Sequence, residues 1–292
     1  MKPLPTLTAV VLALVVAFTG APVLAQQDDA APAAAQAGAS AAIPPGEAGA
    51  KAALEKSPRH GEWVDITVPG SETPLRSFVV YPERKEKAPV VIVIQEIFGL
   101  TDWIRSVADQ LAADGFIAIA PDFLSGMGPG GGGTESLGGK DDVRKMIMNL
   151  KSDDVVNKLN AARDYGMNLP ASNKKTASIG FCWGGKQSFA YAVAQPELNA
   201  AVVYYGTSPE DSAAYGKIKA PVLGLYGSDD ARVNKTIDPA KEAMKGKSYT
   251  PHIYEGAGHG FLRQQDGQNG ANMKAAQQAW PATVKFIKEH AQ

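Results

Sequence analysis

The sequence predicts an α/β fold with a mostly parallel central sheet and helices on both faces. Strand and helix patterns alternate along residues 58–292, which is typical of parallel strands joined by helical crossovers. Residues 89–94 form a continuous apolar run, as expected for a strand buried on both faces. This stretch of about 235 residues is ample for one such core, and it contains no internal repeat and no sign of a second domain.

Short apolar runs predict the strands, and apolar residues at helical spacing predict the helices. We expect strands at 64–68 (an edge strand), 78–81, 89–94, 116–120, 174–179, 200–205 and 221–226, and a last strand that ends at 252–254. We expect helices at 103–112, 141–166, 186–194, 240–245 and 271–290. Between them, residues 125–140 contain a glycine-rich stretch at 126–133, which is either a mobile lid or a tolerated surface insertion.

The N-terminal residues 1–25 have the three parts of a Sec-type signal peptide. Lys2 supplies the positive charge, Leu7 to Phe18 the apolar region, and Val23-Leu24-Ala25 the cleavage site. The apolar run is shorter than the ~20 residues that a membrane span needs. We therefore expect cleavage after Ala25 and a periplasmic or secreted protein with no membrane association afterwards. Residues 26–57, rich in Ala, Pro and Gly, predict a disordered linker before a globular domain at 58–292.

The charge and cysteine content of the chain limit the kinds of partner and cross-link that it can have. The formal net charge is −1 and there is no block of basic residues, which argues against a nucleic-acid partner. The chain has one cysteine, so an internal disulfide is excluded. No pattern calls for a metal or an organic cofactor, and none predicts an oligomeric state.

That cysteine, Cys182, lies in Gly180-Phe181-Cys182-Trp183-Gly184-Gly185, between a predicted strand and a predicted helix. A nucleophile on a sharp strand-to-helix turn needs small neighbours because its backbone is strained. The turn also puts the sulfur at a helix N-terminus, which favours a thiolate. The alternative is a buried structural cysteine, but the glycines and the strand–turn–helix context favour a nucleophile.

A thiol nucleophile needs a base and a group that orients the base. Of the four histidines, His259 lies in a glycine-rich loop directly after the last strand, where it has room to approach the nucleophile. The acid is expected on the loop after the preceding strand, where Asp229 and Asp230 compete. The backbone N–H groups of Trp183 and Ile97 are candidates for an oxyanion hole. Glu96 follows an apolar strand.

Several motifs in this order resemble the dienelactone hydrolase family, namely 95–99 (Gln-Glu-Ile-Phe-Gly), 120–122, 180–185, 204–206, 227–233 and 257–261. The resemblance implies an α/β-hydrolase fold and a catalytic triad of Cys182, Asp230 and His259. It also implies that Glu96 helps to activate the thiol, exchanging between Arg263 and Cys182 as substrate binds. Ester attack by the thiolate would give an acyl-enzyme that water cleaves.

The chain departs from the family in one respect. A second arginine that grips the substrate carboxylate in well-known members is missing after Pro121-Asp122, which puts dienelactone itself in doubt as the substrate. We expect Arg263, Phe123 and Tyr204 to contact the substrate.

The leading hypothesis is an exported carboxylic ester or lactone hydrolase acting on a small molecule. The alternatives are acyl transfer through the same acyl-enzyme, and an exported binding protein with a redox-sensitive thiol.

Overall fold

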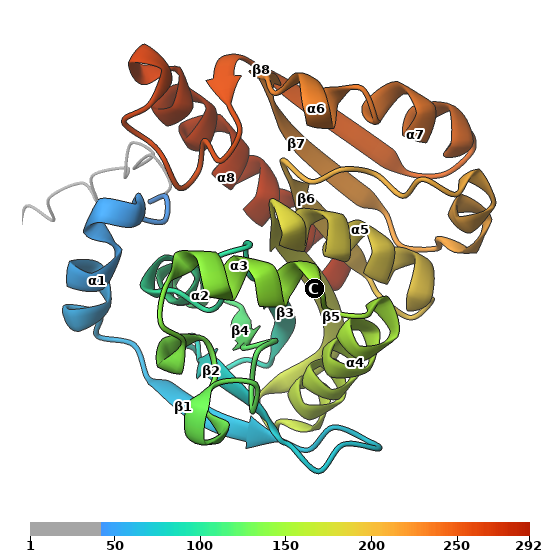
Figure 1. Cartoon of the computed structure of the whole chain (residues 1–292). Helices are drawn as coiled ribbons and strands as arrows, with labels where there is room; N and C mark the ends of the chain where they lie inside the picture. The colour runs from blue at the N-terminus through green and yellow to red at the C-terminus, as the bar shows by residue number, and fades with distance from the viewer. Residues whose placement is uncertain (1–41) are drawn as a thin grey trace, which may run out of the picture. The chain divides into compact units, whose positions relative to one another are not determined.

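The computed structural model describes residues 42–292. The predicted signal peptide and residues 26–41 of the predicted linker lie outside them. The described residues form an eight-stranded sheet in the order β1-β2-β4-β3-β5-β6-β7-β8, in which only the pairs of β2 are antiparallel (Figure 1). The strands are β1 (Gly61–Ile66), β2 (Leu75–Val80), β3 (Ala88–Ile94), β4 (Ile117–Pro121), β5 (Ser172–Phe181), β6 (Ala200–Tyr204), β7 (Val222–Asp229) and β8 (Tyr249–Gly258).

Helices cover both faces of the sheet, as predicted. They are α1 (Glu47–Glu55), α2 (Asp102–Ala113), α3 (Lys140–Met148), α4 (Ser152–Asn168), α5 (Trp183–Ala194), α6 (Ala231–Asn234), α7 (Ile237–Ala243) and α8 (Ala271–Ala291). In Figure 1, α4 and α5 lie in front of the sheet and α8 lies behind it. No helix among the described residues is long and apolar enough to cross a membrane.

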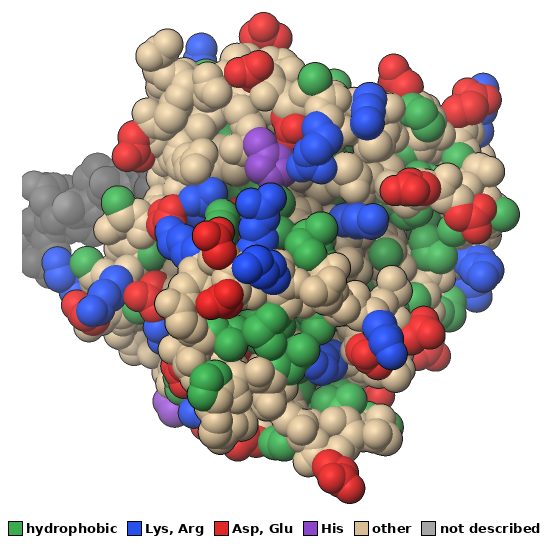
Figure 2. Space-filling model, viewed as in Figure 1, with side chains coloured by type: hydrophobic (Ala, Val, Ile, Leu, Met, Phe, Trp, Pro, Cys, Tyr) green, Lys and Arg blue, Asp and Glu red, His purple; other side chains and the backbone are tan. Residues whose placement is uncertain are grey.

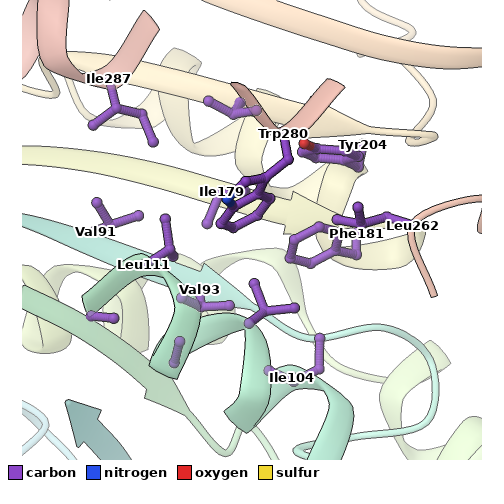
Figure 3. Close-up of a cluster of buried hydrophobic side chains, with 14 of the residues drawn as sticks. Val91, Val93, Ile104, Leu111, Ile179, Phe181, Tyr204, Leu262, Trp280 and Ile287 are labelled. Atoms are coloured by element: carbon purple, nitrogen blue, oxygen red, sulfur yellow. The ribbon is translucent and has the colours of Figure 1, made fainter. Parts of the chain in front are cut away.

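Two hydrophobic cores result from the alternation of side chains along the strands. In β3, Val91 and Val93 point to the core beneath α2 and α8, which Figure 3 shows with Trp280 and Phe181. The intervening residues of β3 belong to the second core, beneath α4, α5 and α7. A strand buried on both faces must be apolar at every position, and that is why residues 89–94 could be identified from sequence.

The predicted disordered linker is wrong for its last part. Residues 47–55 form α1, and Ala50 is buried against the first core. The segment before the helix is held by two hydrogen bonds, from Trp103 Nε1 to the Pro45 carbonyl (3.1 Å) and from Gln265 Nε2 to the Pro44 carbonyl (2.8 Å). Composition suggested disorder because alanines and prolines carry little apolar periodicity, but here the stabilising contacts come from distant parts of the chain.

The predicted single helix at 141–166 is two helices, because its halves pack on different surfaces. Val155 and Leu159 of α4 join the second core, whereas Val143 and Ile147 of α3 join a small separate cluster with Leu124. The chain is extended at Lys151 between them. The glycine-rich stretch before α3 is held at its end by Thr134, whose N–H and hydroxyl both donate to Asp122 at 2.7 Å.

Candidate active site

Four loops that carry predicted site residues leave the same edge of the sheet. Strands β3, β5, β7 and β8 run parallel, so their carboxyl ends lie together, where open α/β sheets bind ligands. Glu96 follows β3, Cys182 follows β5, Asp230 follows β7 and His259 follows β8. Cys182 and His259 both line a cavity of about 710 Å³ at this edge.

Cys182 sits on a strained turn between β5 and α5. Its backbone angles are φ 56° and ψ −112°, which is unusual for a residue with a side chain. The neighbouring glycines are needed because the backbone passes very close. A Cβ at Gly180 would lie 1.9 Å from the Gly184 carbonyl oxygen, and one at Gly184 would lie 2.2 Å from the Ile94 carbonyl oxygen. This is the geometry of a nucleophile elbow.

Asp230 and His259 form the pair expected beside the nucleophile. Asp230 is buried, and its Oδ2 lies 2.5 Å from Nδ1 of His259. Its other oxygen, Oδ1, accepts a hydrogen bond from the Val233 N–H at 3.4 Å and caps α6, which fixes the carboxylate. The neighbouring Asp229 is exposed at the end of β7. The structure therefore brings Asp230, and not Asp229, to His259.

The surroundings of His259 favour its charged form. Burial opposes the charge, but the hydrogen bonds with Asp230 and Cys182 outweigh it and raise the pKa of His259 to about 9. The imidazole therefore carries a proton at neutral pH. A protonated imidazole next to Cys182 stabilises a thiolate, and it holds the proton that a leaving alkoxide needs.

Glu96 and Arg263 form a buried charged pair behind the nucleophile. Glu96 is 3% exposed, and its Oε2 lies 2.7 Å from Arg263 Nε. The distance is that of an ion pair, although the Nε–H is poorly aligned for a hydrogen bond. Burial raises the pKa of Glu96 to about 7, although Arg263 and His259 act in the opposite direction. Glu96 therefore gains or loses its proton near neutral pH.

Arg263 is engaged on its other side as well. Its Nη1 forms an ion pair with Glu47 of α1, and its guanidinium lies over the Phe98 ring at 5.1 Å. The Glu47 N–H also donates to the Arg263 carbonyl at 2.9 Å. Arg263 does not line the cavity that holds Cys182. In this structure it is a partner of two carboxylates, and the predicted contact with substrate is not formed from this cavity.

The predicted substrate contacts Phe123 and Tyr204 are wrong. Both side chains are fully buried and neither lines the cavity. Phe123 packs edge-on against Trp183, with ring centroids 5.7 Å apart, and the Tyr204 hydroxyl is paired with Thr283 Oγ1 at 2.7 Å. Their positions near strand ends predict a place in the cavity wall, but both rings pack in the interior, one against α5 and the other beneath α8.

The two residues whose N–H groups are predicted to form the oxyanion hole lie in the wall of the cavity. Ile97 and Trp183 both line the cavity together with Cys182. Trp183 is the first residue of α5, where an N–H has no partner within the helix. Within residues 42–292, neither N–H donates to a backbone carbonyl. Both are therefore available for the charge that develops on a carbonyl oxygen.

Two groups near the site are not among the residues predicted from the sequence. Tyr205 is buried with φ 38°, and its ring packs edge-on against His259 at 5.2 Å. Glu47 reaches Arg263 from a segment predicted to be disordered. The pair of tyrosines at the end of β6 is a sequence pattern from which Tyr205 could have been identified. No local pattern indicates Glu47, because 216 residues separate it from Arg263.

Charged residues of the cavity wall were also missed. The cations are Arg144 of α3, Lys186 of α5, and Arg232 and Lys235 of the α6 region, and the one carboxylate, Glu210, lies in the loop after β6. In sequence each is an isolated polar residue of a helix or loop. Within the described residues, no group of three or more His, Cys, Asp and Glu side chains is arranged to hold a metal ion.

Comparison with known proteins gives consistent matches. The model of the dienelactone hydrolase family matches residues 75–291. A Yersinia pestis protein named "Putative carboxymethylenebutenolidase" is 29% identical over 243 residues, which cover 77% of this chain and 88% of that protein. A protein of the same name from Methylorubrum extorquens is 28% identical over 239 residues, covering 77% and 80%.

Solved structures give the fold. The crystal structure of a dienelactone hydrolase from Anabaena variabilis is 21% identical, with a TM-score of 0.63, and covers 80% of this chain and 99% of its own. A Klebsiella pneumoniae structure titled "Putative Dienelactone Hydrolase" is 24% identical, with a TM-score of 0.68, and covers 79% and 100%. With the mostly parallel sheet, these similarities confirm the predicted α/β-hydrolase fold.

Proposed function

The chain belongs to the dienelactone hydrolase family and is a hydrolase of that type, and from this we propose that it cleaves a small carboxylic ester or lactone with Cys182 as nucleophile. His259 is the proton carrier and Asp230 orients it. The observation that carries the proposal is the 2.5 Å contact between Asp230 Oδ2 and His259 Nδ1, with the second nitrogen left for the thiol of a strained elbow in the same cavity.

The reaction has two halves. The Cys182 thiolate attacks the carbonyl carbon, and the oxygen becomes an anion that accepts hydrogen bonds from the N–H groups of Ile97 and Trp183. The C–O bond then breaks, the leaving alkoxide takes a proton from His259, and the acyl group stays on sulfur as a thioester. In a lactone the alcohol formed remains attached to the acyl group.

Hydrolysis of the thioester regenerates the enzyme. Neutral His259 takes a proton from water, the resulting hydroxide attacks the thioester carbon, and the thiolate leaves. Asp230 keeps the Nδ1 proton in place during both halves, so Nε2 is the nitrogen that exchanges protons. A Cys182 that is still in its thiol form gives its proton to ionised Glu96 when that carboxylate moves from Arg263 to the sulfur, and the thiolate that attacks is formed in this way.

The first experiment compares turnover of p-nitrophenyl acetate and of a dienelactone by wild type, Cys182→Ala and Cys182→Ser. We expect Cys182→Ala to lose turnover of every substrate that wild type cleaves while its circular dichroism spectrum is unchanged. Electrospray mass spectrometry of quenched wild type should detect the acyl adduct on the peptide with Cys182. Turnover retained in Cys182→Ala would refute the thiol mechanism.

Export is the second part of the proposal. It rests on the three-part signal of residues 1–25. Expression of the full chain in a bacterial host, followed by fractionation and N-terminal sequencing, tests it. We expect a periplasmic or secreted protein that begins at Gln26. An intact chain that begins at Met1 and stays in the cytoplasm would contradict it.

A further inference from the structure

The cavity beside Cys182 has an uneven charge. Four cationic side chains, Arg144, Lys186, Arg232 and Lys235, line it, against one carboxylate, Glu210. The ion pairs found within residues 42–292 include none of the four cations. Their charges are therefore directed to solvent and to whatever occupies the cavity. A cleft lined mainly by one sign of charge concentrates ligands of the opposite sign.

The cations come from separate parts of the fold and converge on the nucleophile. Arg144 belongs to α3, Arg232 to α6 and Lys235 directly follows α6. Lys186 is one helical turn after Cys182, its N–H donates to the Cys182 carbonyl at 3.1 Å, and both residues line the cavity. Figure 2 shows a histidine in the upper central part of this face, with several Lys and Arg side chains beside and below it and some acidic side chains among them.

Arg263 does not take this role. Glu96 and Glu47 neutralise it from two sides, Phe98 covers its guanidinium, and it faces a different hollow, one lined by Glu47 and Lys140. A substrate anion at Arg263 would have to displace Glu47, which is anchored by its own backbone hydrogen bond. The cavity cations have no such competitor.

We propose that Arg144, Lys186, Arg232 and Lys235 form an anion subsite that holds a negatively charged group of the substrate away from the scissile bond. The inference rests on the proposed function and narrows it. The substrates are esters or lactones that carry a carboxylate or another oxyanion, and the anion contacts the cavity rim and not Arg263. Arginine and lysine both suit oxyanions, and the exposed positions make the contact sensitive to salt.

The test uses two esters that differ only in the end of the acyl chain, mono-p-nitrophenyl adipate and p-nitrophenyl hexanoate. The adipate chain is long enough that its own carboxylate does not attack the ester through a five- or six-membered ring. The quantity measured is the ratio of kcat/KM for adipate to kcat/KM for hexanoate. In wild type we expect a ratio well above one that falls as NaCl is raised from 20 to 500 mM.

Replacement of all four cations by glutamine should lower this ratio by about 10-fold or more, and each single replacement by roughly 2- to 5-fold, as expected for exposed charge contacts. Lys175→Gln is the matched control. It removes one exposed lysine at the opposite end of β5, about 23 Å from Cys182 along the strand, and it should leave the ratio unchanged. Circular dichroism checks that every variant is folded.

The outcomes separate the inference from the proposed function. Equal turnover of both esters, lost in Cys182→Ala, would overturn the anion subsite and leave the thiol hydrolase standing. A high ratio that persists in the four-cation variant would also overturn the subsite, because the anion would then be held elsewhere. Turnover of neither ester by wild type, with no acyl adduct, would contradict the proposed function itself.

Discussion

The buried carboxylate of Glu96 makes a quantitative prediction about stability. Its environment contains two opposing influences, since burial favours the neutral acid and Arg263 favours the carboxylate. The perturbation is Glu96→Gln, which keeps the shape and polarity of a neutral glutamic acid but cannot ionise. Below the ordinary pKa of glutamate, wild type and variant therefore both hold a neutral group at this position.

The pKa sets the size and the sign of the effect. Burial raises it from the ordinary 4.5 to about 7. Between these two values the folded chain keeps a proton that the unfolded chain has released, so the free energy of unfolding falls as pH rises. The contribution is fully present below pH 4.5 and is lost as pH rises through 7. At about 1.4 kcal/mol per pH unit, wild type loses up to about 3 kcal/mol relative to Glu96→Gln.

The assay is urea unfolding followed by tryptophan fluorescence at pH 5, 6, 7 and 8, with wild type and variant measured side by side. The difference between the two proteins cancels the titration of groups that they share, including His259. Glu55→Gln, at an exposed position of α1, controls for the change from an acid to an amide. We expect the stability difference to move in favour of Glu96→Gln as pH rises and to level off above pH 7.

Two results would refute the reasoning. A difference that does not change with pH would mean that the pKa of Glu96 is the same in the folded and unfolded chain. A difference that moves in favour of wild type as pH rises would mean that the attraction of Arg263 exceeds the cost of burial. In either case Glu96 would be ionised throughout the neutral range, and its carboxylate would be too weak a base to keep the thiol proton in the proposed way.

Three further predictions follow from the same geometry. Asp230→Asn removes the acceptor that holds Nδ1–H of His259, so kcat for p-nitrophenyl acetate should fall by on the order of 10³–10⁴ with the fold intact, and a loss below 10-fold would contradict the role of the pair. Gly184→Ala places a Cβ against two carbonyl oxygens at the end of β3. Urea titrations should show a free energy of unfolding that is lower by about 1–3 kcal/mol, and turnover should fall as well. A variant as stable as wild type would refute the steric argument. Glu47→Gln removes a negative charge that raises the pKa of Glu96. In the Glu47→Gln background the stability gain from Glu96→Gln should therefore level off at a lower pH and at a smaller value than in the wild-type background. An unchanged pH dependence in the same urea titrations would show that the two carboxylates do not interact.

The sequence predicted those parts of the fold and site that depend on neighbouring residues. The apolar run of β3 identifies a buried strand, because both of its faces are covered. The glycines around Cys182 identify the elbow, because the strain and the close approach occur within five residues. His259 could be selected because the loop after a final parallel strand opens at the same edge as the elbow. In each case the physical cause lies within the motif or follows from chain order.

The parts that were missed depend on contacts between distant residues. The segment of α1 has too little apolar periodicity to predict a helix, and its position is set by Trp103, Gln265 and Arg263. Phe123 and Tyr204 were expected at the cavity because they lie near strand ends, but whether such a side chain faces the cavity or the core depends on the packing of the neighbouring helix. Local pattern does not contain that information.

The difference between local motifs and contacts of distant segments also concerns the choice of substrate. The proposed nucleophile, its base and the proposed oxyanion N–H groups all lie at the carboxyl ends of parallel strands, and their chemistry serves any ester. The charges around them come from α1, α3, α5 and the α6 region, where one substitution changes the sign of a wall without disturbing a strand. In this chain Glu47 of α1 pairs with Arg263, while none of the ion pairs within residues 42–292 includes the four cavity cations. If the proposed anion subsite is correct, substrate choice depends on charged side chains that take no part in bond breaking, and variants of these charges change specificity before they change chemistry.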